Sequence, residues 1–141
     1  MEEISQGIYI PVQGPLEIKQ VNVKKGDISK ILQSDFNDHV TIFGSKGFHL
    51  ILFCDDAGLS KGLSVNPLAT RLICQRTGRD GILIPKSALL LDDYKKLTLD
   101  DFRFLLKELF DIKDEKKEVK KMNDVIRDLK SRGTKYTIIL T

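Results

Sequence analysis

The residue types that most often carry chemistry are few in this chain, and their spacing predicts no catalytic or metal centre. There are two histidines, His39 and His49, and two cysteines, Cys54 and Cys74. Neither pair has the C-x-x-C or H-x-x-x-H spacing of zinc ligands, and no Cys–His signature marks a nucleophile. Both cysteines lie in apolar stretches, which favours buried reduced thiols over a disulfide framework. We therefore expect a protein that is not an enzyme and that uses no metal and no cofactor.

Two further patterns suggest ligand chemistry but have simpler explanations. Asp55, Asp56 and Asp80 are able to form an acidic metal site, but adjacent aspartates after an apolar run are more typical of a solvated turn. The stretches GSKG and LSKG look like phosphate loops, yet neither fits the pattern G-x-x-x-x-G-K-[ST]. The glycines of GSKG are better explained by a hairpin loop, because β-branched and aromatic runs lie on both sides.

One stretch, GLSVNPLATRL, is a candidate for binding. Asn66 is a favoured residue just before a helix, and Pro67 fits the first helical position because it has no N–H. The free N–H groups at such a helix start attract anions. Lys61, Ser64 and Arg71 lie close to Asn66 in the sequence and complete a candidate partner or anion site.

Two interpretations of Asn66 are open at this point. In the first, the side chain only caps the helix, and aspartate, which is also a good cap, replaces it with little loss of stability. In the second, a phosphate or a partner binds at the helix start. A capping side chain already occupies one of the N–H donors, which favours the first interpretation.

The apolar spacing predicts both strands and helices along the chain. Strands are predicted over residues 7–12, 15–23, 39–43, 48–53, 81–85 and 135–141. Helices are predicted over residues 27–36, 66–77, 97–110 and 113–133. Asp27 is the expected cap of the first helix, and Thr98 with Asp101 forms a capping box for the third. The residues expected in the core include Leu50, Leu52, Ile73, Phe102 and Leu106.

The fold class that follows is α+β. Hairpin-type strand pairs and separated helices dominate over strict βαβ alternation, which predicts a mixed, largely antiparallel sheet with helices packed on one face. A length of 141 residues suits a single domain with one core. The longest apolar run is shorter than the ~20 residues that a membrane span needs, and the acidic start MEEISQG is unlike a signal peptide. We therefore expect no membrane partner and a cytoplasmic location.

The segment over residues 111–141 is a candidate interaction segment. Val119, Met122, Ile126 and Leu129 recur at steps of three and four and form a narrow apolar stripe on the predicted helix. The stretch YTIILT would expose an apolar strand edge if it stayed unpaired. Covering both requires either the chain's own sheet, which we favour, or a second chain.

The order of these elements resembles a family of small domains of unknown function carried mainly by bacteriophages, their hosts and some large DNA viruses. The family pattern is a Gly-Leu followed closely by Asn-x-x-Ala, then a Gly leading an aliphatic strand, then a Leu-Ser/Thr-x-x-Asp helix start. In this chain the pattern falls on Gly62, Leu63, Asn66, Ala69, Gly81 and Leu97 to Asp101. The resemblance covers about residues 15–110, so residues 1–110 form the family-like core and residues 111–141 an extension. It implies a viral accessory protein in a host cell and brings no known catalytic residues.

Two function classes remain. The first is a non-enzymatic protein that binds a host or viral protein, or a copy of itself, through the C-terminal segment. The second is a nucleotide or nucleic-acid binder that acts against host defence through the helix start at Asn66. The balance of 23 basic and 20 acidic residues is nearly even, and acidic residues interrupt the lysines between Lys113 and Lys121. This charge pattern favours the first class.

Overall fold

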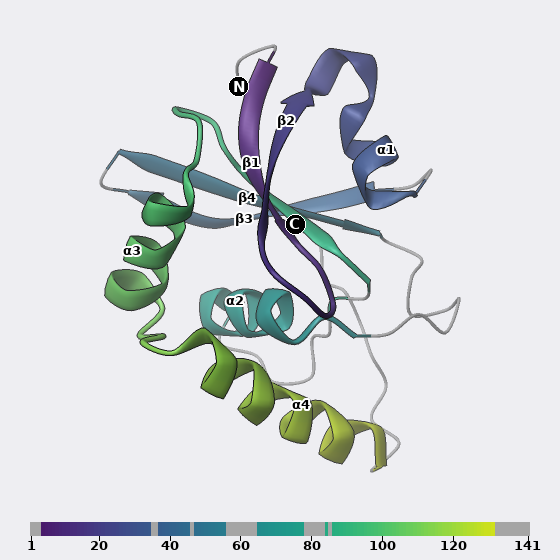
Figure 1. The fold of residues 1–141 in the computed structure, drawn as a ribbon, viewed down its shortest axis with the longest axis vertical. Helices are drawn as coiled ribbons and strands as arrows, with labels where there is room; N and C mark the ends of the chain where they lie inside the picture. Colours follow the sequence, from purple (N-terminus) through teal and green to yellow (C-terminus); the bar gives the residue numbers. More distant parts are fainter. Residues whose placement is uncertain are drawn as a thin grey trace.

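Five strands form one antiparallel sheet in the spatial order β2-β1-β5-β4-β3 (Figure 1). The computed structural model describes residues 4–34, 37–45, 47–55, 65–77, 84 and 86–131. Each pair of neighbouring strands runs antiparallel. The predicted α+β class is therefore confirmed, and the sheet of the described residues is antiparallel throughout rather than mixed.

Strands and helices alternate along the chain, and the first four strands come in two consecutive pairs. They are β1 (Ile4–Ile10), β2 (Glu17–Asn22), the 3-10 helix η1 (Val23–Lys25), α1 (Asp27–Leu32), β3 (Asn37–Ser45), β4 (Phe48–Asp55), α2 (Pro67–Thr77), β5 (Ala88–Asp92), α3 (Leu99–Leu109) and α4 (Glu115–Ser131). The two predicted hairpins are present as β1–β2 and β3–β4, and β3 contains a bulge between Thr41 and Phe43. The predicted strand over residues 135–141 lies outside the described residues.

Helices cover both faces of the sheet, which corrects the expectation that they pack on one face. The larger core lies between one face and helices α2 and α3, where Leu50, Leu90 and Phe102 are buried together. The smaller cluster lies on the other face, where Leu32 of α1 packs on Leu89. Adjacent residues of one strand point to opposite faces, so Leu89 and Leu90 of β5 belong to different clusters. Figure 1 shows α1 apart from α2 and α3.

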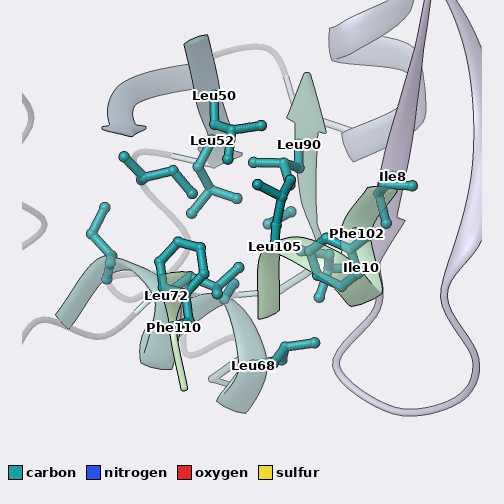
Figure 2. Packing of buried hydrophobic residues seen from close by; sticks show 14 of the residues in the cluster. Ile8, Ile10, Leu50, Leu52, Leu68, Leu72, Leu90, Phe102, Leu105 and Phe110 are labelled. Carbon is teal, nitrogen blue, oxygen red and sulfur yellow. The ribbon is translucent and has the colours of Figure 1, made fainter. Parts of the chain in front are cut away.

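The five residues expected in the core are all buried. Figure 2 shows how side chains from the sheet, α2 and α3 gather in the larger cluster. Leu50 and Leu52 come from β4, Ile73 from α2, and Phe102 and Leu106 from α3, and each exposes no more than 2% of its surface. The amphipathic spacing of the α3 sequence thus predicts its buried face correctly.

Strand β5 is an element that the sequence pattern does not predict. The pattern predicts a strand over residues 81–85, whereas the strand runs over Ala88–Asp92. Of the predicted span only residue 84 is described, and it is not in a strand. All five residues of β5 are buried, because the strand has a neighbour on each side and cover on both faces. A run of this kind shows no alternation of polar and apolar residues by which to recognise a strand.

The two predicted caps have different outcomes. The capping box of α3 is confirmed, since the Thr98 hydroxyl accepts from the Asp101 N–H and the Asp101 carboxylate accepts from the Thr98 N–H. Asp27 is not a cap, because it is already the first residue of α1 and Gly26 precedes it in a left-handed conformation. The Asp27 carboxylate instead accepts from the Asn22 N–H at 2.8 Å, which ties α1 to the end of β2.

Leu106→Ala should lower the free energy of unfolding by about 2–5 kcal/mol, because it removes buried methyl groups and leaves a cavity between α3 and the sheet. Urea denaturation measures the change. The matched control is Lys107→Ala, which shortens an exposed side chain on the same helix and should change stability by less than about 0.5 kcal/mol. Equal stability of the two variants would contradict the packing of α3 described above.

Candidate functional site

Asn66 lies at a junction of three chain segments and is completely buried. Its Oδ1 accepts from the Ala69 N–H at 3.0 Å, which is the bond of a helix cap, and its Nδ2 donates to the Ile10 carbonyl at 2.8 Å. Its own N–H donates to the Ile84 carbonyl at 2.7 Å. The side chain therefore joins the start of α2 to the end of β1, and its capping role is present as predicted.

Most of the other residues predicted around Asn66 lie outside the described residues, so the candidate anion site stays a prediction. Lys61 and Ser64 lie outside the described residues, as do Gly62, Leu63 and Gly81 of the family-like pattern. Both side-chain groups of Asn66 are bonded within the chain. The geometry that the structure describes here is that of a buried structural junction.

Arg71 connects α2 to α4 and to the end of α3. Its Nε donates to Glu118 Oε1 at 2.6 Å, and one terminal nitrogen donates to the Phe110 carbonyl at 3.1 Å. The Arg71 and Glu118 side chains are only 22% and 17% exposed. A charged pair with this burial and an additional carbonyl acceptor positions one helix against another. Arg71 thus forms hydrogen bonds inside the domain.

The apolar stripe of the C-terminal segment packs largely within the chain. Helix α4 lies along α2, on the side of α2 that faces away from the sheet (Figure 1). Met122 and Ile126 are 8% and 6% exposed, and Val119 is half-buried against the larger core. The side chain of Leu129 lies outside what the structure describes. The helix docks on α2 and not directly on the sheet, because α2 already covers that part of the sheet.

The histidines and aspartates give no metal centre in the described part of the chain. No group of three or more His, Cys, Asp or Glu side chains there is placed to hold a metal ion. Cys54 and Asp55 are both buried. Asp56, Asp80 and the side chain of Cys74 lie outside the described residues. None of the described helices is both long and apolar enough to cross a bilayer.

A polar cluster at the end of β5 escapes prediction from the sequence. Asp92 is 1% exposed, and its carboxylate accepts from the backbone N–H groups of His49, Tyr94 and Lys95. His49 Nδ1 is bonded to the Asp93 carboxylate, and the Tyr94 ring lies 5.8 Å from the imidazole. The cluster closes the turn after β5 and ties it to β4. Its only sequence signal is the Asp-Asp pair that follows the apolar run ALLL.

A surface groove of about 760 Å³ lies among the described residues. Its walls come from four parts of the fold, namely the β1–β2 connection, the start of α2, the start of α3 and the first half of α4. The lining residues are 10–16, Pro67 and Leu68, Leu99 and Arg103, and Glu115, Lys116, Val119 and Asn123. Its volume lies within the ~300–1,000 Å³ typical of ligand sites.

The floor of this groove is the open side of the larger core. Ile10 and Leu68 are buried core residues that reach the groove from below. Leu16, Leu99 and Val119 are half-buried, pack against the same core, and also line the groove. Apolar side chains that are exposed together in a hollow are typical of binding sites.

Charged side chains lie along the margin of the groove formed by α3 and α4. Arg103 and Lys116 line it together with one acid, Glu115. A second hollow of about 440 Å³ adjoins it and shares these three residues, with Lys107 and Lys113 added to its lining. The α3–α4 side of the groove therefore combines an apolar floor with a largely basic edge.

The groove could not be found from the sequence, because its residues are spread over more than 110 positions of the chain. The prolines at positions 11 and 15 are its clearest local signal, since they fix the β1–β2 connection that forms one wall. Glu115, Lys116, Val119 and Asn123 of the predicted interaction segment line the groove, and of these Val119 belongs to the predicted apolar stripe.

No protein-family model matches the chain, and neither a curated protein nor a solved structure matches it. The resemblance to a family of viral domains therefore stays a prediction from the sequence.

Asn66→Asp should destabilise the protein by at least about 2 kcal/mol at neutral pH, contrary to the expectation that aspartate replaces it with little loss. The substitution keeps the oxygen that accepts from Ala69 but sets a buried carboxylate against the Ile10 carbonyl. The measurement is urea denaturation, with the exposed Asn123→Asp as the matched control. If the Asn66→Asp chain unfolds at the same urea concentration as the parent, the bond to Ile10 contributes nothing to stability.

Arg71 and Glu118 should be energetically coupled. We expect a double-mutant cycle with Arg71→Met and Glu118→Gln to give a coupling energy of about 0.5–3 kcal/mol, because each side chain loses its partner in a half-buried position. Thermal or urea unfolding of the four chains measures this energy. Strictly additive effects of the two substitutions would show that the pair does not hold α4 against α2.

Proposed function

We propose that this protein is a non-enzymatic binding protein that holds an apolar segment of another polypeptide in the groove between the β1–β2 connection and helices α2, α3 and α4. The observation that carries the proposal is the set of half-buried aliphatic side chains on the groove floor, Leu16, Leu99 and Val119. Covering them with apolar side chains of a partner removes apolar surface from water, which contributes roughly 25 cal/mol for each Å² buried.

The open shape of the groove favours a polypeptide over a small molecule. Sites for small molecules typically enclose 70–90% of the ligand surface. Here Gln13 and Gly14 on one wall and Lys116 and Asn123 on the other are exposed. A ligand that contacts such a groove with one face and leaves the other in water is typically a peptide or a protein surface.

The walls favour a helical segment over an extended strand. A peptide that adds to a sheet needs free backbone N–H and C=O groups along the groove. Helices α2, α3 and α4 use most of these groups in their own hydrogen bonds. Pro11, Pro15 and Pro67 of the lining have no N–H at all. Recognition therefore depends on side chains, as when an amphipathic helix lies in an apolar groove.

The viral accessory role and the nucleotide-binding alternative rest on the sequence. The first follows from the resemblance of residues 15–110 to viral domains. The second depends on Lys61 and Ser64, and the Asn66 side chain at the same helix start is used inside the chain. No described contact favours the nucleotide alternative, so polypeptide binding is the function that we propose.

The groove is tested with a tryptophan reporter, because the chain contains no tryptophan. Gln13→Trp places an indole on the exposed wall of the groove. Helical model peptides with leucine at i, i+3, i+4 and i+7 should shift its emission to shorter wavelength, and peptides with alanine at these positions should not. Peptides of three kinds are used, with glutamate, glutamine or lysine at the remaining positions.

Blocking the groove gives the matched comparison. Asn123→Phe adds a ring to the lining and should weaken binding of the leucine peptides at least fivefold, about 1 kcal/mol. Lys121→Phe adds the same ring to an exposed position of α4 outside the lining and should leave binding unchanged. The proposal fails if no leucine peptide binds, or if both variants bind like the parent.

A further inference from the structure

The groove carries its charge on one side. Arg103 of α3 and Lys116 of α4 line it directly, and Lys107 and Lys113 line the adjoining hollow. The carboxylates of the two hollows are Asp114 and Glu115. The four cations thus exceed the two carboxylates at the place where α3 and α4 meet.

Both carboxylates lie at the start of α4. Asp114 Oδ1 accepts from the backbone N–H groups of Lys116 and Lys117 and so caps α4. Glu115 is in the first turn of the same helix, where the partial positive charge of the helix start attracts acids. The partial positive charge at the start of α4 therefore partly offsets the negative charge of these two acids.

The ion pair that Arg103 does make is weak. Its guanidinium lies 3.8 Å from Asp100, and the two side chains are 63% and 99% exposed. Exposed pairs of this kind contribute little, and the arginine keeps several N–H donors for another partner. Lys116 of α4, on the same side of the groove, also has an exposed side chain. A ligand in the groove would therefore have two cations along its α3–α4 side.

We propose that the polypeptide bound in the groove is an acidic amphipathic helix, whose leucine-like side chains fill the groove while its carboxylates pair with Arg103 and Lys116. This inference rests on the proposed function and names the chemistry of its partner. Charge complementarity carries it, since a basic margin beside an apolar floor selects acidic partners and repels basic ones.

Charge also argues against the chain's own last residues as the occupant. Residues 132–141 contain Arg132 and Lys135 and no acidic side chain. A segment with two cations would meet the basic margin with like charge, which is unfavourable. A separate acidic polypeptide fits the same surface without this repulsion.

The three model peptides with a common leucine face test the inference. We expect the glutamate peptide to bind about tenfold more tightly than the glutamine peptide, and the lysine peptide to bind most weakly. The preference should shrink as salt rises from about 50 to about 500 mM, because exposed charges are screened. Fluorescence of the Gln13→Trp chain measures all three affinities.

Charge reversal supplies the matched pair of variants. Arg103→Glu combined with Lys116→Glu should abolish the preference for glutamate and make the lysine peptide the tighter ligand. Lys121→Glu combined with Arg127→Glu changes the net charge equally at exposed positions outside the lining and should keep the parent's order. Thermal unfolding of both double variants is measured as well, and their peptide affinities are compared only if the two proteins are equally stable.

Four results would overturn the inference. Equal binding of the three peptides would leave the groove as a polypeptide site without charge selection, whereas no binding by any peptide would also end the proposed function. Tighter binding of a synthetic peptide of residues 132–141 would make the chain's own segment the occupant. A dimer in solution that the Arg103→Glu and Lys116→Glu chain no longer forms would make a second copy the occupant.

Discussion

The buried amide of Asn66 is the interaction on which the rest of the domain depends. One of its atoms caps α2 and another holds the carbonyl at the end of β1, while its backbone N–H binds the Ile84 carbonyl. The Thr70 hydroxyl accepts from the Ile84 N–H. Ile84 is therefore hydrogen-bonded through both its N–H and its carbonyl, shortly before β5 begins. A group with no exposure must satisfy its hydrogen bonds within the protein, and here the bonds to Ile10 and Ile84 join segments far apart in the sequence. The position of α2 on the sheet follows from these bonds.

The groove is a consequence of the same junction. Ile10 ends β1 and leads into the connection that forms one wall, and Pro67 and Leu68 begin α2 and contribute to the base. The opposite wall is α4, which Arg71 and Glu118 hold against α2 and which buries Met122 and Ile126. The apolar stripe that resembles an interaction surface in the sequence is thus largely used to attach the helix. The part of α4 that lines the groove is its first half, where Val119 and the exposed Lys116 and Asn123 lie. This is the part of the helix that the proposed partner would contact.

Local patterns allow much of the fold to be predicted, and non-local contacts account for the rest. The capping box at Thr98 and the spacing of Phe102 and Leu106 define α3 from a few neighbouring residues, and they are confirmed. Strand β5 has no such pattern, because burial on both faces removes the alternation of polar and apolar residues. The sequence likewise shows that Asn66 suits a cap but not that its amide reaches Ile10, 56 positions away. The groove depends on four such distant segments, and among its residues only Val119 belongs to the apolar stripe that was predicted to interact.

The construction of the groove also bears on how it would bind. Its walls are attached to the core through Asn66, through the Arg71–Glu118 pair and through prolines that restrict the β1–β2 connection. Walls held in this way lose little conformational freedom when a ligand arrives, and such preorganisation lowers the free-energy cost of association. The apolar floor supplies affinity that depends little on sequence, whereas Arg103 and Lys116 at the margin act on charge and at longer range. Apolar contact and charge selection therefore reside in different residues, so a substitution at the margin can change the choice of partner while the floor and the fold beneath it stay intact.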